Sequence, residues 1–246
     1  MKKRVSILGS GISGIGAAIL AKEKGYDVFV SDNNKINSKA KNKLDSISVP
    51  WEENNHSYNH LKKSDLIIKS PGISNELEVI TKLRSSNVKI ISEIEFASLH
   101  TNSFIIGITG SNGKTTTTEL IYHILNKSGL NVGIAGNIGT SFSKQIAENS
   151  FEYYVLELSS FQLDDIIDFK PNIAIITNLF EDHLDRYNYD FSKYIDSKLR
   201  ITMNQETNDT ILYNVDDKIL KNAINTSGSK ASKMTYGINS SSFDGK

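Results

Sequence analysis

The sequence of 246 residues contains no cysteine and only three prolines. The absence of cysteine excludes disulfides, thiolate zinc sites, iron–sulfur clusters and a cysteine nucleophile. Basic and acidic residues number 28 each, so there is none of the basic excess that is usual in nucleic-acid-binding proteins. No apolar run approaches the ~18 residues of a membrane span, and the first apolar run is too short for a signal peptide. We therefore expect a cytoplasmic protein that binds neither nucleic acid nor a membrane. We also expect the chain to be a monomer.

Short apolar runs alternate with longer amphipathic runs, which is the rhythm of βαβ units with a parallel sheet. The expected strands are Val5–Leu8, Asp27–Ser31, Asp65–Lys69, Val88–Ile91, Phe104–Ile108, Asn131–Ala135, Tyr153–Leu158, Asn172–Thr177, Thr210–Asn214 and Lys233–Tyr236. The expected helices are Ile12–Lys24, Glu76–Ser85, Ser92–His100, Lys114–Lys127, Ser143–Glu148, Phe191–Thr202 and Asp216–Asn225. The rhythm restarts at Phe104, so we predict an α/β fold of two domains, residues 1–95 and 96–246.

A first glycine-rich loop follows the strand Val5–Leu8 and opens the next helix. Its glycines, Gly9, Gly11 and Gly14, match G-x-G-x-x-G, a pattern that lets a phosphate approach the backbone at a helix N-terminus. Asp32 follows the second strand, where an acidic side chain can bind a ribose hydroxyl. The loop therefore indicates a nucleotide site for NAD or for another diphosphate, and the alternative is a tight turn that binds nothing.

A second glycine-rich loop, residues 109–116, separates a buried strand from a helix. Position 108 is isoleucine, so the loop fails the strict spacing G-x-x-x-x-G-K-[ST]. The mechanics of phosphate binding survive, because Gly110 and Gly113 free backbone N–H groups for phosphate oxygens. Lys114 can reach β- and γ-phosphates, and Thr115 can offer its hydroxyl to Mg²⁺. A chance turn without a ligand is the alternative.

A carboxylate interrupts the apolar run of Tyr153–Leu158 at Glu157. An unpaired carboxylate inside a sheet is costly, so Glu157 should have a cation as its partner or lie at the exposed carboxyl end of the strand. Ligands bind at that end in sheets of this kind. The cation is either a metal ion or a structural lysine or arginine.

Three acids and a histidine follow the strand Asn172–Thr177 within five residues. They are Glu181, Asp182, His183 and Asp185. Oxygen-rich side chains at a strand end are typical of a hard-cation or phosphoryl-transfer site. The alternative is a solvated polar loop. We assign no role to the other histidines, at positions 56, 60, 100 and 123.

A lysine lies among the apolar positions of the amphipathic segment Phe191–Thr202. Lys198 shares that face with aromatic and aliphatic residues at helical spacing. Such a lysine either extends its ammonium group to water or is held inward. If it is held inward, desolvation lowers its pKa and leaves part of it as a neutral amine, which can react with carbon dioxide to form a carbamate. A carbamate is an anionic oxygen ligand suited to Mg²⁺.

Five motifs in collinear order resemble the ATP-dependent Mur ligases, and the resemblance spans essentially the whole chain. The motifs are residues 109–115, Gly136–Gly139, Leu156–Leu163, Asn178–Tyr187 and Lys198–Arg200. The run Leu156–Leu163 and the turn Ser70–Ser74 are more similar to the MurD-type members. Five motifs in order are far more specific than either glycine loop alone.

The resemblance implies a Rossmann-like N-terminal domain that holds the uridine diphosphate of a substrate rather than NAD. It also implies a P-loop-type central ATPase domain with a mostly parallel sheet, which we expect to be incomplete at its C-terminus. The implied substrate-binding residues are Ser10, Gly11, Ile12, Ser13, Asp32, Asn33, Ser70, Gly72, Ile73, Asn137, Ser159 and Gln162. The implied ATP-binding residues are Gly110, Ser111, Asn112, Gly113, Lys114, Thr115 and Thr116.

The resemblance also implies two Mg²⁺ sites. Thr115 and Glu157 would hold the first ion, and His183 with a carbamylated Lys198 would hold the second. The implied catalytic residues are Lys114, Glu157, His183 and Lys198. The positioning and charge neutralisation that phosphoryl transfer requires suit this set.

The implied reaction is ATP-dependent addition of D-glutamate to UDP-N-acetylmuramoyl-L-alanine through an acyl phosphate. The family's third domain, which binds D-glutamate, is missing from these 246 residues, so we expect ligase activity of a longer parent and none of this chain alone. The alternatives are another Mur ligase, a folylpolyglutamate synthase-like enzyme, or a nucleotide-binding module without catalysis.

Overall fold

A computed structural model describes residues 2–238 of the chain. Contacts divide it into two compact units, and neither is a single stretch of sequence. The first unit comprises Met1–Thr101, Thr140–Ser150 and Asp165–Ile167, and the second comprises Asn102–Gly139, Phe151–Asp164 and Asp168–Lys246. The expected division at residue 95 falls inside helix α5 (Glu93–Ser98). We expected the central domain to be incomplete at its C-terminus. That expectation falls on residues 239–246, which lie outside the described residues.

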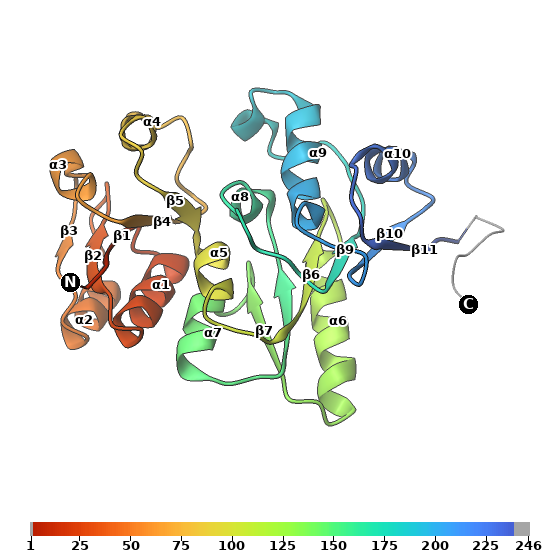
Figure 1. The fold of residues 1–246 in the computed structure, drawn as a ribbon, viewed down its shortest axis with the longest axis horizontal. Helices are drawn as coiled ribbons and strands as arrows, with labels where there is room; N and C mark the ends of the chain where they lie inside the picture. The colour runs from red at the N-terminus through yellow and green to blue at the C-terminus, as the bar shows by residue number, and fades with distance from the viewer. Residues whose placement is uncertain (1, 239–246) are drawn as a thin grey trace. The chain divides into compact units, whose positions relative to one another are not determined.

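The first unit is built on a five-stranded sheet whose paired strands are all parallel. The strand order is β3 (Trp51–Glu52), β2 (Asp27–Ser31), β1 (Arg4–Leu8), β4 (Leu66–Lys69) and β5 (Ile90–Ser92). Its helices are α1 (Ile12–Glu23), α2 (Ser38–Ser46), α3 (Tyr58–Leu61), α4 (Glu78–Ser85), α5 and α7 (Phe142–Glu148). Figure 1 shows α3 and α4 above these strands and α1 and α2 below them.

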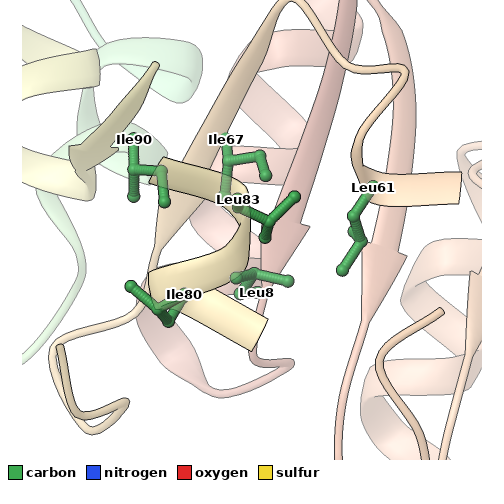
Figure 2. Packing of buried hydrophobic residues seen from close by; sticks show 6 residues of the cluster. All are labelled: Leu8, Leu61, Ile67, Ile80, Leu83 and Ile90. Carbon is green, nitrogen blue, oxygen red and sulfur yellow. The ribbon is translucent and has the colours of Figure 1, made fainter. Parts of the chain in front are cut away.

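Apolar strand residues of the first unit point into helices on both faces of the sheet, as a parallel sheet requires. Figure 2 shows one such cluster, which joins strands β1, β4 and β5 to helices α3 and α4. Its members are Leu8, Leu61, Ile67, Ile80, Leu83 and Ile90, none more than 8% exposed. Each fully buried leucine or isoleucine contributes about 1.5–3 kcal/mol, so this cluster is a main reason why α4 stays on the sheet.

Helix α7 packs against α1 and α5, although its sequence lies between two strands of the second unit. The close approach depends on Gly16 of α1, where a Cβ atom would lie 1.9 Å from Ser141 Oγ. Ser141 is itself the N-cap of α7, and its side chain accepts a hydrogen bond from the backbone N–H of Lys144. A segment distant in sequence therefore completes the helical layer of the first unit.

The second unit is built on a six-stranded sheet, again with parallel pairs only. The strand order is β11 (Ser232–Tyr236), β10 (Thr210–Asn214), β9 (Ile173–Ile176), β6 (Phe104–Thr109), β8 (Tyr153–Glu157) and β7 (Val132–Gly136). Its helices are α6 (Lys114–Lys127), α8 (Ser160–Leu163), α9 (Phe191–Leu199) and α10 (Lys218–Thr226), with 3₁₀ turns η1 (Leu184–Tyr187) and η2 (Arg200–Thr202). Helix α6 packs on β6, β7 and β8, over a core of Ile106, Ile108, Val132, Val155 and Ile175.

The predicted fold class is confirmed, with two α/β units on parallel sheets. Strands β2 and β10 and helix α6 have the predicted bounds. The sequence patterns did not predict α2, β3, α3 or α8, which are short or polar. No helix within residues 2–238 is long and apolar enough to cross a membrane.

Candidate functional site

The first candidate site lies where the strand order of the first sheet reverses. The chain runs outward from β1 through β2 to β3, then returns to β4 on the other side of β1. Loops at the carboxyl ends of β1 and β4 diverge there, and ligands of open α/β sheets bind at such a point. The glycine loop follows β1 and the turn Ser70–Ser74 follows β4, so both predicted segments are placed at this position.

Two glycines of the first loop are required by close contacts. Gly9 has φ +91°, and a Cβ atom there would lie 2.7 Å from Ser70 Oγ. A Cβ atom on Gly14 would lie 1.9 Å from the carbonyl oxygen of Gly9. Gly11, the second glycine of the motif, has open space around it, so it leaves room beside the N-terminus of α1 rather than avoiding a clash. The motif therefore combines packing with access for a ligand.

A cavity of about 570 Å³ opens between these loops. All the residues predicted in the first domain to bind substrate line it, namely Ser10, Gly11, Ile12, Ser13, Asp32, Asn33, Ser70, Gly72 and Ile73. Ser70 Oγ is buried and makes no hydrogen bond with the described residues. A buried hydroxyl without a partner on the wall of a cavity is suited to bind a polar ligand.

Asp32 fixes the glycine loop. Its Oδ2 atom accepts hydrogen bonds from the backbone N–H of Ser10 at 2.7 Å and from the Ser10 hydroxyl at 2.6 Å, and Oδ1 accepts one from the N–H of Asn34. Partial burial raises the pKa of Asp32, but these hydrogen bonds outweigh it and leave the pKa below its ordinary value. Asp32 is therefore ionised at neutral pH and joins the loops that follow β1 and β2.

His56, to which the sequence patterns gave no role, also lines the cavity. Its Nδ1 atom lies 2.7 Å from Ser31 Oγ. Burial lowers the pKa of His56 below its ordinary value, although the negative charges of Asp32 and Glu52 oppose this, so the ring is neutral at pH 7. His56 follows β3, a strand of two residues that has no detectable period, and no sequence signal marks its position.

The second candidate site is the loop between β6 and α6. Gly113 is the N-cap of α6 with φ +80°, and Gly110 has φ +140°. A Cβ atom on Gly110 would lie 2.0 Å from Thr177 Oγ1, whereas Gly113 has open space. The first backbone N–H groups of α6 have no partner inside the helix, and they provide the usual setting for a phosphate.

The phosphate loop is held in place from the end of β9. Thr177 Oγ1 and Asn178 Nδ2 both donate to the carbonyl oxygen of Asn112, at 2.7 and 3.0 Å. The N–H of Asn112 donates in return to Asn178 Oδ1 at 2.9 Å. Ser111 is buried, and its hydroxyl donates to the Phe180 carbonyl at 2.8 Å. The loop is therefore shaped before any nucleotide binds.

A buried carboxylate lies beside this loop. Glu157 ends β8, is 1% exposed, and accepts hydrogen bonds of 2.8 Å from the Thr115 hydroxyl and the Asn137 side-chain amide. Both donors are neutral, and within residues 2–238 no ion pair involves Glu157. The structural salt bridge considered above is thus ruled out for the described part of the chain. A buried anion with neutral donors only, next to a hydroxyl, fits a hard divalent cation.

Two lysines meet at the phosphate loop. Lys114 Nζ donates to the carbonyl oxygens of Gly110 and Ser111, at 2.9 and 2.8 Å. Lys198 Nζ donates to the same Gly110 oxygen at 2.8 Å and lies 4.6 Å from the centre of the Tyr194 ring. Lys198 is 2% exposed, so it is held inward rather than extended to water. Burial, and then the charge of Lys114, lower the pKa of Lys198 to about 7.

Residues 108–245 match the family described as Mur ligase middle domain, which is more than half of the chain, and residues 4–79 match the MurD N-terminal domain. The chain belongs to the Mur ligase family.

Two relatives of this Mur ligase chain carry the name UDP-N-acetylmuramoylalanine--D-glutamate ligase. The chain is 52% identical over 229 residues to the protein from Bacteroides thetaiotaomicron, which covers 93% of the chain and 52% of that relative. It is 48% identical over 238 residues to the protein from Christiangramia forsetii, a match that covers 97% of the chain and 54% of that relative. The chain therefore spans about half the length of the curated relatives that it matches.

Solved structures of Mur ligases share the fold. The UDP-N-acetylmuramate:L-alanyl-gamma-D-glutamyl-meso-diaminopimelate ligase from Neisseria meningitides matches with a TM-score of 0.67 at 20% identity, over 96% of this chain and 78% of that one. A murein peptide ligase from Psychrobacter arcticus matches with a TM-score of 0.61 at 20% identity, over 99% of this chain and 59% of that one.

The structure of this Mur ligase chain does not bring together all the residues that the sequence singled out. Within residues 2–238, no three side chains of histidine, aspartate or glutamate form a metal-binding group. Glu181, His183 and Asp185 are exposed, as in the solvated loop that was the alternative to a hard-cation site. His183 has φ +51°, and its ring lies 5.4 Å from that of Phe161. Its role as a metal ligand stays a prediction.

Ser159 and Gln162 form a capping box at the start of α8. Gln162 Oε1 accepts hydrogen bonds from the N–H and the hydroxyl of Ser159, and Ser159 Oγ accepts one from the N–H of Gln162. Gln162 is 2% exposed, so its side chain stabilises the helix start. Substrate contact by these two residues stays a prediction, and the geometry favours Ser159, which is only partly buried.

Proposed function

We propose that this chain forms the nucleotide-sugar site and the ATP site of a ligase that adds D-glutamate to UDP-N-acetylmuramoyl-L-alanine. The proposal draws its reaction from the two relatives of that name. The match of residues 4–79 to a MurD N-terminal domain favours this reaction over that of another Mur ligase or a folate-linked ligase. In this proposal the reaction is cytoplasmic and belongs to peptidoglycan synthesis, and the enzyme acts as a monomer without nucleic acid or membrane.

One observation carries the ATP half of the proposal. The buried carboxylate of Glu157 is hydrogen-bonded to Thr115, the residue that follows Lys114 at the start of α6. A lysine, a hydroxyl and a carboxylate at the mouth of a glycine loop form the set that binds the phosphates of a nucleoside triphosphate with Mg²⁺. Thr115 and Glu157 would hold the ion, which when bound would neutralise charge on the phosphate oxygens.

The residues of the phosphate loop would act by position and charge. The free N–H groups at the start of α6 would bind phosphate oxygens, and the Lys114 ammonium group would turn from the loop carbonyls to the β- and γ-phosphates. The hydrogen bonds of Asn112 and Ser111 to the segment after β9 hold these donors in place. Little reorganisation would then be needed when ATP binds, which favours catalysis by positioning.

We further propose that Lys198 is carbamylated in the working enzyme. With its pKa lowered to about 7, a sizeable fraction of Lys198 is a neutral amine at neutral pH. The amine nitrogen would form a bond to the carbon of carbon dioxide and lose one proton to solvent, which leaves a carbamate of charge −1. With His183, that carbamate would hold a second Mg²⁺.

The cavity of the first unit would bind the uridine diphosphate part of the substrate. The first N–H groups of α1 and the Ser13 side chain would bind the diphosphate at the helix N-terminus, and Ser70 Oγ would supply a further polar atom. Asn137 and Ser159, next to Glu157 in the second unit, would contact the muramoyl-peptide end. Gln162 would support Ser159 through the capping box.

The chemistry proposed has two steps. The alanyl carboxylate attacks the γ-phosphorus of ATP, and ADP leaves with the bonding electron pair of the broken P–O bond, which gives an acyl phosphate. The amine of D-glutamate then attacks the acyl carbon, phosphate leaves, and the amine loses a proton. In this proposal the residues of the phosphate loop act in the first step, because they would surround the phosphates of ATP.

Calorimetric titration of the 246-residue chain tests the proposal. We expect one molecule of a non-hydrolysable ATP analogue to bind in the presence of Mg²⁺, and one molecule of UDP-N-acetylmuramoyl-L-alanine to bind to the same preparation. A plain nucleotide-binding module would bind the ATP analogue but not the muramoyl nucleotide. Absence of binding by the muramoyl nucleotide would therefore reject the ligase reading.

A further inference from the structure

An ion cluster in the first unit adjoins the cavity but is not part of its lining. Lys69, the last residue of β4, is 2% exposed, and its Nζ atom lies 3.0 Å from Asp165 Oδ2, which is also buried. Arg84 of α4 donates to Asp165 Oδ1 at 2.6 Å. Asp165 is 81 residues from Arg84 and reaches the first unit through the short segment Asp165–Ile167.

The cluster is tied to the turn that forms one wall of the cavity. Lys69 Nζ donates to the carbonyl oxygen of Ile73 at 2.7 Å, across the turn that begins at the next residue. The N–H of Ile73 donates to the carbonyl of Ser70 at 3.1 Å. Arg84 also donates to Asn75 Oδ1 at 3.0 Å. The carboxyl end of the Ser70–Ser74 turn is therefore attached to Asp165 through two cations, Lys69 at Ile73 and Arg84 at the following Asn75.

The burial of this cluster is difficult to explain as stabilisation alone. Buried ion pairs are on average weak contributors to stability, because desolvation offsets their attraction. Two cations share one carboxylate here, and one of them is almost wholly buried. The arrangement has a clear geometric result, since it fixes a carbonyl of a cavity-lining residue. Polar networks that fix conformation in this way are best attested where a particular register or shape is needed.

We propose that Lys69 and Asp165 are positioning residues for the nucleotide-diphosphate cavity, with Arg84 as the third member. They hold the Ser70–Ser74 turn in the binding conformation without touching the ligand. This inference rests on the proposed function for the identity of the ligand. A turn that is ordered only one-tenth of the time would weaken apparent affinity about tenfold, because apparent Kd equals intrinsic Kd divided by the competent fraction.

Two readouts on the full 246-residue chain test the inference. The first is hydrogen exchange of the Ile73 N–H in the ligand-free protein, and the second is the calorimetric Kd for UDP-N-acetylmuramoyl-L-alanine. In Lys69→Met we expect faster exchange at Ile73 and an affinity about tenfold lower. The affinity for the ATP analogue should stay the same. Lys82→Met is the matched control, because Lys82 forms an exposed ion pair with Glu78 on α4, and it should change neither readout.

Arg84→Gln is a second variant that tests the same attachment if Lys69→Met does not fold. The Arg84 side chain is 44% exposed, so its loss should be tolerated, with about threefold weaker binding and faster exchange at Ile73. Unchanged exchange and unchanged Kd in the folded variants would overturn the inference, even if their unfolding midpoint falls. Failure of the wild-type chain to bind the muramoyl nucleotide would instead reject the proposed function, and the exchange readout would still decide the role of Lys69.

Discussion

The ammonium group of Lys198 donates a hydrogen bond of 2.8 Å to the carbonyl oxygen of Gly110, the same atom that accepts from Lys114 at 2.9 Å. Two cations thus share one acceptor beneath the phosphate loop, and one of them is almost fully buried. Burial and the nearby charge of Lys114 both favour the neutral form of Lys198 and so lower its pKa.

The low pKa of Lys198 gives a pH-dependent stability. The unfolded chain keeps this proton up to a pKa near 10.5, whereas the folded chain releases it at about 7. The unfolded state therefore binds more protons between these values, and folding stability rises with pH through that window. Lys198→Met should be more stable than the wild type at pH 6.5, with a gap that narrows toward pH 10. Urea unfolding at several pH values measures this, with the exposed Lys193→Met as control. A stability difference between Lys198→Met and the wild type that stays constant with pH would contradict the lowered pKa of Lys198.

Glu157→Gln tests the proposed magnesium site. The amide keeps the shape of the side chain and removes its charge, so the variant should fold. We expect Mg²⁺ to strengthen binding of the ATP analogue to the wild type at least tenfold, which is about 1.4 kcal/mol. It should have little effect on the variant, because the variant lacks the carboxylate that would hold the ion. Glu119→Gln, on the exposed face of α6, should behave as the wild type. Equal magnesium dependence in Glu157→Gln would remove this residue from the site.

Gly110 and Gly113 should respond differently to alanine. At Gly110 a methyl group would clash with Thr177 Oγ1 in a backbone conformation that disfavours side chains, whereas at Gly113 only the backbone conformation is unfavourable. We expect Gly110→Ala to lose about 3 kcal/mol of stability and all measurable binding of the ATP analogue. Gly113→Ala should lose about 1 kcal/mol. Denaturant unfolding compares the two, and similar losses would show that the contact with Thr177 is unimportant.

Glu93 predicts a second pH effect, in the first unit. Its side chain is 2% exposed and accepts a hydrogen bond from the N–H of Ser143 in α7, while its Oε2 atom has no partner among the described residues. Burial raises the pKa of Glu93 to about 7. The folded chain therefore binds the extra proton between pH 4.5 and 7, and the stability that this proton maintains is lost as the pH rises through 7.

The measurement for Glu93 is thermal unfolding of Glu93→Gln at pH 5 and pH 8. We expect the variant to be more stable than the wild type at pH 8, by on the order of 2 kcal/mol, and close to it at pH 5. Glu148→Gln, an exposed residue at the end of α7, is the control. A variant less stable than the wild type at both pH values would show that Glu93 is stabilised as an anion.

The sequence predicted those parts of the molecule that depend on local patterns. Apolar runs with glycine after them located β1, β6 and their loops, and helix α6 begins and ends where its pattern does. Helix α2 was not predicted because it is rich in lysine and buries only Ala40 and Leu44. Strand β3 has two residues, too few for a period.

Contacts between distant residues account for most of what the sequence did not show. The carboxylate of Glu157 could be expected to need a partner, but its hydrogen bonds to Thr115 and Asn137 span 42 and 20 residues. The sequence left the direction of Lys198 open, and packing decides it. The attachment of Lys69 to Asp165 has no local pattern, because the two residues belong to elements that only the fold brings together.

The most direct test of the central claim is a competition between two nucleotides for the cavity of the first unit. In a calorimetric titration of the 246-residue chain, we expect UDP-N-acetylmuramoyl-L-alanine to bind at one molecule per chain and NAD not to displace it. In Asp32→Asn the muramoyl nucleotide should bind at least tenfold more weakly, since a neutral amide holds Ser10 less well. Binding of NAD without binding of the muramoyl nucleotide would contradict the account.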